Sequence, residues 1–157
     1  MRSFLGVLVL AWLSVVAVFG QTPDFTGTWK QIGLSERVTI EKIEQRDSYL
    51  RVASDSRDMP ARESTLARPL AALMGNVEYR TDGAEQFDTY ANGRQRWRTV
   101  AWQGPALVFL TIEKDGYRVS VTRESWTLSD AGDVLTKTIR VVSMDGVSER
   151  TVTFQRE

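Results

Sequence analysis

From residue 77 onward, apolar and polar positions alternate in short segments that turn signals separate at regular intervals. The expected turns are Asp82-Gly83, Asn92-Gly93, Gln103-Gly104-Pro105, Asp115-Gly116, Ser129-Asp130-Ala131-Gly132 and Asp145-Gly146. Asn-Gly and Asp-Gly favour tight hairpin turns because both central residues of such a turn need positive φ. The segments between the turns are rich in Val, Thr, Tyr, Trp and Phe, which suit half-buried strands. The pattern therefore predicts about seven sequential strands in an antiparallel meander.

Three further strands are expected nearer the N-terminus, over Phe25 to Gln31, Val38 to Glu44 and Tyr49 to Ala53. The total is then about ten strands, many of ordinary length for a small β domain. An open antiparallel sheet of that size leaves two bare edges, which closure into a barrel removes. We therefore expect an all-β fold, an antiparallel meander closed into a barrel of about 8–10 strands. A two-sheet sandwich is the alternative.

One segment departs from the strand pattern. Residues 64–75 carry Ala and Leu in place of β-formers, Pro69 suits a first helical turn, and Gly75 suits a helix stop. One short helix is therefore expected over Pro69 to Met74. It would either cap the mouth of the barrel, where Leu70 and Met74 would meet a ligand, or cover a sheet edge. The preceding residues, 54–63, are polar and predict a loop.

Strand alternation distributes side chains between the two faces of each strand. Arg94, Arg96 and Arg98 share one face of their strand, and Trp97 lies on the other. Burying an unpaired charge costs several kcal/mol, so Trp97 is expected inside and the arginines in water. In the opposite orientation, with Trp97 outside, the three arginines would line a cavity with positive charge. Between Tyr117 and Leu128 the apolar positions change parity, which predicts a bulge near residues 123–125.

The first twenty residues have the layout of a secretory signal peptide. Arg2 precedes an apolar run from Phe4 to Phe19, which ends in small residues before Gln21. The run is shorter than the roughly 20 residues that a spanning helix needs. We expect cleavage after Gly20 and export of residues 21–157 as a single domain, periplasmic or secreted and without integral membrane association. A retained membrane anchor is the alternative.

The composition restricts the chemistry that the protein can perform. The 157 residues include no Cys and no His, and 20 Lys+Arg balance 20 Asp+Glu. Ser-His-Asp and Cys-His catalysis and the usual zinc sites are excluded, and the balanced charge argues against nucleic-acid binding. Carboxylate pairs such as Glu41 with Glu44 could do acid–base chemistry, but no pattern places one in a cleft, so solvated surface is expected. We expect no cofactor, no metal and no enzymatic activity.

The stretch Gly27-Thr28-Trp29-Lys30, followed by an antiparallel meander, resembles the first strand of the lipocalin and fatty-acid-binding protein group, the calycins. The resemblance implies that Gly27 and Trp29 close one end of the barrel. It also implies that the Trp29 ring packs under a cation of the last strand, with Arg156 the first choice and Arg150 the second. The Arg-x-Tyr carboxylate clamp of fatty-acid-binding proteins has no counterpart, because Val152 and Phe154 occupy the matching positions.

The chain after residue 20 also resembles a group of small exported bacterial proteins with lipocalin-like folds and no assigned activity. The shared features are the opening Gly-Thr-Trp-Lys, the stretch Thr81-Asp82-Gly83, and a Trp-x-Leu-Ser stretch at residues 126–129. The resemblance implies a lipocalin-like barrel for the whole exported domain.

The expected function is non-covalent binding of a small apolar or amphipathic molecule inside the barrel. Aromatic side chains would line the pocket or, if no cavity exists, fill a solid core. The candidate ligand-binding residues are Phe87, Trp97, Phe109, Tyr117, Trp126 and Phe154, with Leu70 and Met74 at the mouth. The alternative is a solid barrel that acts through its outer surface as a protein-interaction or inhibitor-like module in the cell envelope.

Overall fold

The computed structural model describes residues 22–33, 37–58 and 75–157, which form one ten-stranded antiparallel sheet. The strands are β1 (Gly27–Ile32), β2 (Arg37–Arg46), β3 (Tyr49–Asp58), β4 (Gly75–Arg80), β5 (Gln86–Thr89), β6 (Gln95–Gln103), β7 (Ala106–Asp115), β8 (Arg118–Leu128), β9 (Val134–Ser143) and β10 (Gly146–Arg156). Their order in the sheet is β4-β3-β2-β1-β10-β9-β8-β7-β6-β5. Among the ten strands of the described residues, only β1 and β10 pair without being consecutive in the chain. The all-β fold and the meander are therefore confirmed.

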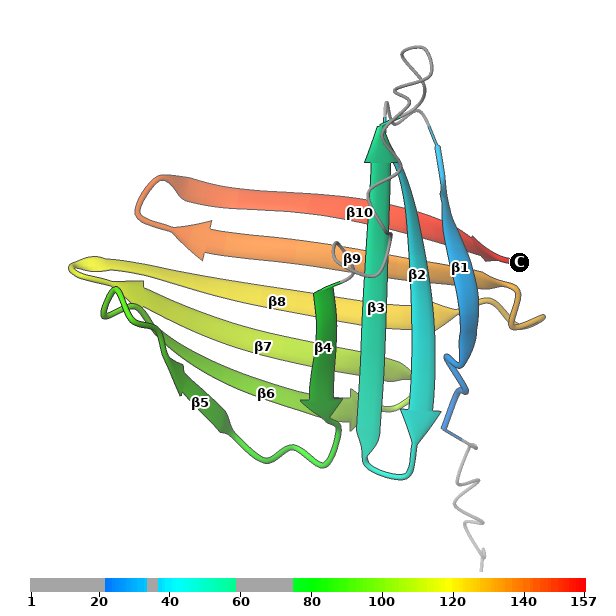
Figure 1. Ribbon diagram of the computed structural model, residues 1–157, viewed down its shortest axis with the longest axis horizontal. Helices are drawn as coiled ribbons and strands as arrows, with labels where there is room; N and C mark the ends of the chain where they lie inside the picture. The colour runs from blue at the N-terminus through cyan, green and yellow to red at the C-terminus, as the bar shows by residue number, and fades with distance from the viewer. Residues whose placement is uncertain (1–21, 34–36, 59–74) are drawn as a thin grey trace, which may run out of the picture.

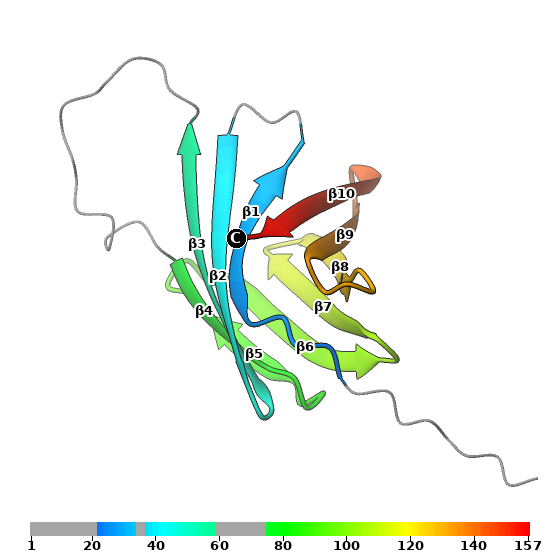
Figure 2. The same ribbon diagram turned by 90° about the vertical axis from the view of Figure 1, so that its right-hand side faces the viewer.

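The sheet curls on itself so that its two halves form two layers. In Figure 1, β1 to β4 cross in front of β6 to β10, and Figure 2 shows the two layers with the interior between them. Strand β1 joins the layers because it pairs with β2 on one side and β10 on the other. Tight turns connect the long strands, and Gly116 adopts a positive φ of 59°. Asp115 does not, because Asp47 is the only non-glycine residue with a positive φ in the described part of the chain, so the expected turn with positive φ at both residues of the Asp-Gly pair does not form here.

The edge strands β4 and β5 form no ladder with each other within the described residues. Backbone hydrogen bonds of residues 81–83 connect the two layers instead. The N–H of Thr81 donates to the Ser48 carbonyl at 2.7 Å, and the N–H of Gly83 donates to the Val100 carbonyl at 2.9 Å. Asp82 forms an isolated bridge with Ala101. The barrel is therefore closed at this end of β6 to β10, which we call the closed end, and it keeps a gap between β4 and β5.

The hydrophobic core lies at the closed end. Its fully buried side chains are Phe25, Trp29, Ile43, Leu50, Val100, Leu107 and Leu135. The Phe25 ring stacks on Trp102 with 5.7 Å between ring centroids, and it meets Trp126 edge-on at 5.9 Å. Aromatic rings from both layers thus fill this end of the barrel.

The Gly-x-Trp stretch of β1 has a specific role at the closed end. Gly27 adopts a φ of 148°, which L side chains rarely adopt. Two residues later, the Trp29 indole N–H donates to the Phe25 carbonyl at 2.8 Å. The Arg156 guanidinium lies 4.5 Å from the centroid of the Trp29 ring, the cation–π contact that the resemblance implies. Arg150, the second choice for this role, lines an internal cavity instead.

The arginine ladder of β6 faces inward, so the expectation that it lies in water is wrong. Val100 is fully buried, and alternation along β6 turns Arg98 and Arg96 to the same inner side. Arg94 directly precedes β6 and lies, like Arg96, against the Tyr90 ring. The cations have partners there. Arg98 lies 4.8 Å from the centroid of the Tyr79 ring, and Arg96 pairs with the Asp88 carboxylate at 2.9 Å. The expectation assumed a buried charge without a partner, and these contacts remove that cost.

Trp97 consequently lies on the outer face, where its ring packs against Phe87 with 5.0 Å between centroids. The two side chains begin an apolar row on which each residue stands directly opposite the next across neighbouring strands. The row consists of Phe87, Trp97, Ile112, Val121, Val142 and Val147. We call it the outer row.

The bulge expected near residues 123–125 is not present, because β8 keeps one register along its whole length with both β7 and β9. The apolar residues change parity because those in the first half of β8 face outward and those in the second half face inward. Trp126 points into the core, whereas Val119 and Val121 face outward.

Strand β3 continues past Ala53 to Asp58, so residues 54–58 belong to a strand and not to the expected loop. Pairing with β2 accounts for the extension, because β2 is long enough to offer partners up to Arg37. The helix expected over Pro69 to Met74, with its candidate residues Leu70 and Met74, lies outside the described residues. The predicted signal peptide, residues 1–20, lies outside them as well.

Candidate functional site

A cavity of about 390 Å³, partly open to solvent, lies between the two layers of the barrel, and we call it the internal cavity. Its apolar and aromatic lining consists of Val52, Val77, Tyr79, Trp126, Ile139, Val152 and Phe154. Its polar lining consists of Gln31, Thr39, Glu41, Ser54, Glu124, Lys137 and Arg150. These residues come from β1 to β4 in one layer and from β8 to β10 in the other. The cavity wall is therefore amphipathic.

Lys137 and Glu41 form a buried ion pair and hydrogen bond across the cavity wall, from β9 to β2. The Lys137 ammonium also lies over two aromatic rings, with its Nζ 3.5 Å from the centroid of the Trp126 ring and 5.0 Å from that of Phe154. Burial lowers the pKa of the Lys137 ammonium, and the neighbouring Glu41 carboxylate opposes that shift. Glu41, which the charge pattern predicts to be solvated, is buried because alternation on β2 places it beside Ile43.

Polar contacts hold the aromatic rings of the cavity in position. The Trp126 indole N–H donates to the Glu124 carboxylate. The Tyr79 ring meets Phe109 edge-on with 5.0 Å between centroids and carries the Arg98 guanidinium on its face. Burial raises the pKa of the Tyr79 hydroxyl. The wall that a ligand would meet is thus preorganised.

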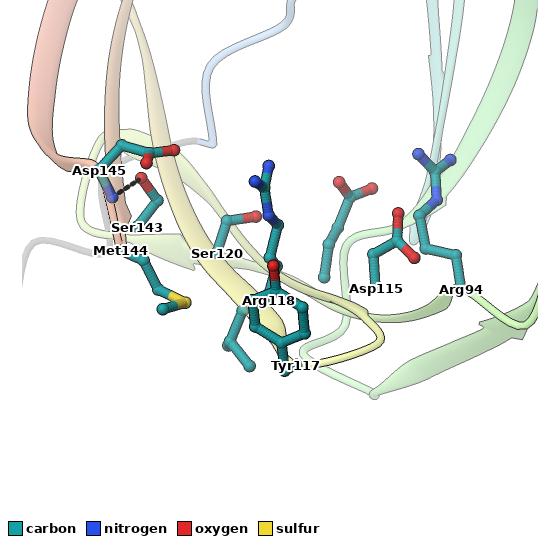
Figure 3. Close-up of a pocket in the computed structure, with 10 residues that line it drawn as sticks. Arg94, Asp115, Tyr117, Arg118, Ser120, Ser143, Met144 and Asp145 are labelled. Carbon is teal, nitrogen blue, oxygen red and sulfur yellow. Dashed lines mark hydrogen bonds between the residues drawn. The ribbon is translucent and has the colours of Figure 1, made fainter.

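A second cavity, of about 380 Å³, opens where the β7–β8 and β9–β10 hairpins turn, which we call the hairpin end. Figure 3 shows its charged and hydroxyl lining, including Arg94, Asp115, Arg118 and Ser143, and the hydrogen bond from the Asp145 N–H to Ser143 Oγ. Two of its side chains are well exposed, with 79% of Tyr117 and 70% of Met144 accessible to solvent.

The two cavities lie on one inner surface. Ile139 lines the internal cavity and Ser143 lines the second one, and alternation along β9 turns both to the same side. Ile139 and Ser143 are four residues apart, which is about 13 Å along the strand at roughly 3.3 Å per residue. An elongated molecule could therefore contact both.

The aromatic residues predicted to line a pocket are distributed over the whole molecule. Trp126 and Phe154 line the internal cavity, and Phe109 packs against Trp126 with 4.7 Å between centroids. Tyr117 lines the second cavity at the tip of a hairpin. Phe87 and Trp97 lie on the outer face and line neither of these two cavities.

Sequence reasoning missed the buried cation of the site. Leu135, Lys137 and Ile139 are alternate positions of one strand, so a single charge interrupts an inward-facing apolar set. That interruption is the signal that marks Lys137 in the sequence. No comparable signal marks its partner Glu41, because Thr39 and Gln45 share its face of β2 with Ile43, so a polar residue there interrupts no apolar set.

Within the ranges 22–33, 37–58 and 75–157, no cluster of three or more acidic side chains is placed to hold a metal ion. No helix of this described part is long and apolar enough to cross a membrane.

Other solved structures resemble this curled sheet in fold. The zebrafish ileal bile acid-binding protein complexed with cholic acid matches with a TM-score of 0.54 at 12% identity, over 85% of this chain and 98% of that one. The fold is that of a lipocalin-like calycin barrel. A secretory abundant heat soluble protein from Ramazzottius varieornatus also matches this lipocalin-like barrel with a TM-score of 0.54, at 13% identity, over 85% of this chain and 95% of that one.

A second protein of that kind from the same organism, secretory abundant heat soluble protein 4, matches with a TM-score of 0.53 at 12% identity. The match covers 84% of this chain and 94% of that one. At these identities the likeness concerns the fold alone. No protein-family model and no curated protein sequence matches the chain.

Proposed function

We propose that the protein is an exported binding protein that holds a small amphipathic molecule in the internal cavity and catalyses no reaction on it. The observation that carries the proposal is the amphipathic cavity of about 390 Å³ between the two layers. Concave sites with an apolar wall and a few placed polar groups are the usual form of a small-molecule site.

The apolar part of the ligand would lie against Tyr79, Trp126 and Phe154, which share one region of the lining. Burial of apolar surface there contributes about 25 cal/mol per Å², so 100 Å² would stabilise the complex by roughly 2.5 kcal/mol. The wall is already held by its own hydrogen bonds and ring contacts, which limits the ordering cost of binding.

The polar part of the ligand would meet the remaining polar lining. Lys137 and Glu41 are already paired with each other, so Ser54 and the exposed Arg150 are the groups that face a ligand head group. A hydroxyl and a guanidinium suit a hydroxyl-bearing or acidic head group. The zebrafish protein of the same fold is complexed with cholic acid, a molecule of this amphipathic class.

Native mass spectrometry tests this function. The protein, purified from an exporting host, is compared before and after denaturation, and then after addition of a lipid, fatty-acid and bile-acid panel. We expect a ligand mass that denaturation removes, or a one-to-one complex with a member of the panel. A spectrum that none of these treatments changes would overturn the proposal.

Two substitutions on the same strand provide a matched pair for this measurement. Ile139→Trp places a large side chain in the cavity, and Val142→Trp places it on the outer face. Binding should be lost in the first variant and kept in the second, provided that both retain the far-ultraviolet circular dichroism of the parent. Equal binding by both variants would show that the ligand lies elsewhere.

Export rests on the N-terminal pattern described above, with Arg2 before an apolar run and cleavage after Gly20. The exported part would then be the single domain 21–157, periplasmic or secreted. The intact mass of the protein recovered from an exporting host tests this proposal, because it should equal that of a chain that begins at Gln21. A retained N-terminus would favour the membrane anchor.

The alternative function, an interaction module in the cell envelope, is favoured by one observation, the outer row. An apolar row that crosses six strands on an outer face is unusual for a monomeric protein. Sedimentation velocity of the parent and of Val142→Glu tests whether the row is covered by a second copy. Self-association that the variant abolishes, together with no bound ligand, would favour this alternative.

A further inference from the structure

Lys137 is unlike the other lysines of the chain. Its side chain is 5% exposed and lines the internal cavity, whereas those of Lys30 and Lys42 are 51% and 61% exposed and Lys114 is exposed as well. The proposed non-covalent function gives this amine no task beyond its ion pair with Glu41.

The surroundings of Lys137 are those of an amine that can act as a nucleophile. A lysine attacks a carbonyl only as the neutral amine, and a desolvated apolar setting favours that form. Burial acts in this direction at Lys137. The Glu41 carboxylate is hydrogen-bonded to the same Nζ, so it can take up a proton and return it to a nearby oxygen.

We propose that Lys137 binds an amphipathic aldehyde covalently and reversibly, as an imine, within the internal cavity. The inference rests on the proposed function, because the same cavity must accept the apolar part of the ligand. It adds the ligand class, an aldehyde, and the atom that holds it, Lys137 Nζ.

The reaction balances without any further reactant. Glu41 accepts a proton from the Lys137 ammonium, and the free amine attacks the aldehyde carbon to form a carbinolamine. Glu41 then returns the proton to the carbinolamine hydroxyl, which leaves as water while the C=N bond forms. The product is a protonated imine, so the aldehyde and the ammonium give an iminium and one water with the positive charge conserved.

The iminium keeps the contacts that now stabilise the ammonium. It carries the same single positive charge beside the Glu41 carboxylate, and it still lies against the Trp126 and Phe154 rings. Covalent binding therefore leaves no buried charge without a partner. The aldehyde's chain would extend along the apolar lining of Val52, Ile139 and Val152.

Reductive trapping with decanal tests the inference. The protein is incubated with decanal and cyanoborohydride, which converts an imine into a stable secondary amine, and the labelled lysine is located by peptide mapping. We expect the decyl group on Lys137 in preference to the exposed Lys30, Lys42 and Lys114. Excess decanol, which fills the cavity but forms no imine, should reduce labelling of Lys137 about tenfold and leave the exposed lysines unchanged.

The binding of decanol, measured by native mass spectrometry, separates the two proposals. If decanol binds and Lys137 is not labelled by decanal, the imine is overturned and the binding function stands. If Lys137 is not labelled, decanol does not bind and the lipid, fatty-acid and bile-acid panel also leaves the spectrum unchanged, both proposals fail.

Two variants define the roles of the pair. Lys137→Arg keeps a cation beside Glu41 but cannot form an imine, so it should bind decanol and lose the label. Glu41→Gln removes the proton carrier and should slow labelling of Lys137 about a hundredfold with decanol still bound. Lys114→Arg, at the hairpin end, is the matched control and should change neither result. Unchanged labelling of Lys137 in Glu41→Gln would overturn the role of Glu41.

Discussion

Strands β6 to β10 carry a packed core at one end and a polar, exposed surface at the other. At the closed end Val100, Leu107 and Leu135 are fully buried. At the hairpin end the turns between these strands present Tyr117 and Met144 to solvent, and the inner face of the strands is charged. The contrast indicates that one end of the barrel supplies the stability of the fold, which leaves the other end free to carry polar groups for recognition.

The internal cavity lies between these two extremes. Trp126 and Phe154 belong both to the core and to the cavity lining, and they contact the buried Lys137. A polar site therefore borders the core directly, and the two buried charges of this site are paired with each other. Four substitutions test this comparison between the two ends.

Trp29→Ala should have the largest effect on stability. The side chain is fully buried, its N–H bonds the Phe25 carbonyl, and its ring lies under Arg156. We expect the free energy of unfolding to fall by about 3–5 kcal/mol, measured by urea denaturation. Tyr117→Ala, at the hairpin end, should change it by less than about 0.5 kcal/mol. Similar losses in both variants would contradict the contrast between the ends.

Lys137→Met should have the next largest effect, because it leaves the Glu41 carboxylate buried without its partner. The expected loss is about 3 kcal/mol in the free energy of unfolding. The double variant Lys137→Met/Glu41→Leu removes both charges and should recover most of that loss, because well-packed apolar residues often replace a buried pair at little cost. If the double variant were less stable than the single one, the pair would not be the cause.

Arg156→Gln should be milder. It removes the cation from the Trp29 ring and the hydrogen bond from Nη2 to the Asp24 carbonyl. We expect a loss of about 1–2 kcal/mol in the free energy of unfolding, with a smaller loss in Arg156→Lys. Arg94→Gln removes a similar cation–π contact, with Tyr90, at the hairpin end and should cost less. A larger loss in Arg94→Gln than in Arg156→Gln would indicate that the closed end does not contribute more to the stability of the fold.

Asp24→Asn should have the smallest effect, visible only in acid. Hydrogen bonds from Thr26, the side chain more than the backbone N–H, lower the pKa of Asp24. The folded protein therefore binds this proton at a lower pH than the unfolded chain does. The resulting stabilisation is complete above the unfolded value of 3.8 and is lost as the pH falls through the lowered folded pKa.

The measurement is urea denaturation at about pH 5 and about pH 3. Between these values the parent should lose more of its unfolding free energy than Asp24→Asn does. Equal losses in the two proteins would show that Asp24 does not contribute to acid sensitivity.

The strands and turns of this protein could be predicted from local sequence. Asp115-Gly116 and Asp145-Gly146 turn the chain where they are expected to, because positive φ at a turn depends on the residues that form it. Strand existence follows in the same way from β-branched and aromatic segments. The resemblance of the Gly-x-Trp stretch to calycins implied that β1 closes one end of the barrel, and β1 pairs with β10 in the structure.

Which face of a strand turns inward could not be predicted in the same way. Arg98 faces inward, where its guanidinium contacts the ring of Tyr79, a residue of β4, and Trp97 faces outward as a consequence. Glu41 and Lys137 form their pair 96 residues apart in the chain. Alternation specifies which side chains share a face, but the cost of burying that face depends on partners that only the folded layers bring together. Local sequence thus specifies the strands and turns, and packing between the layers selects the interior and with it the site.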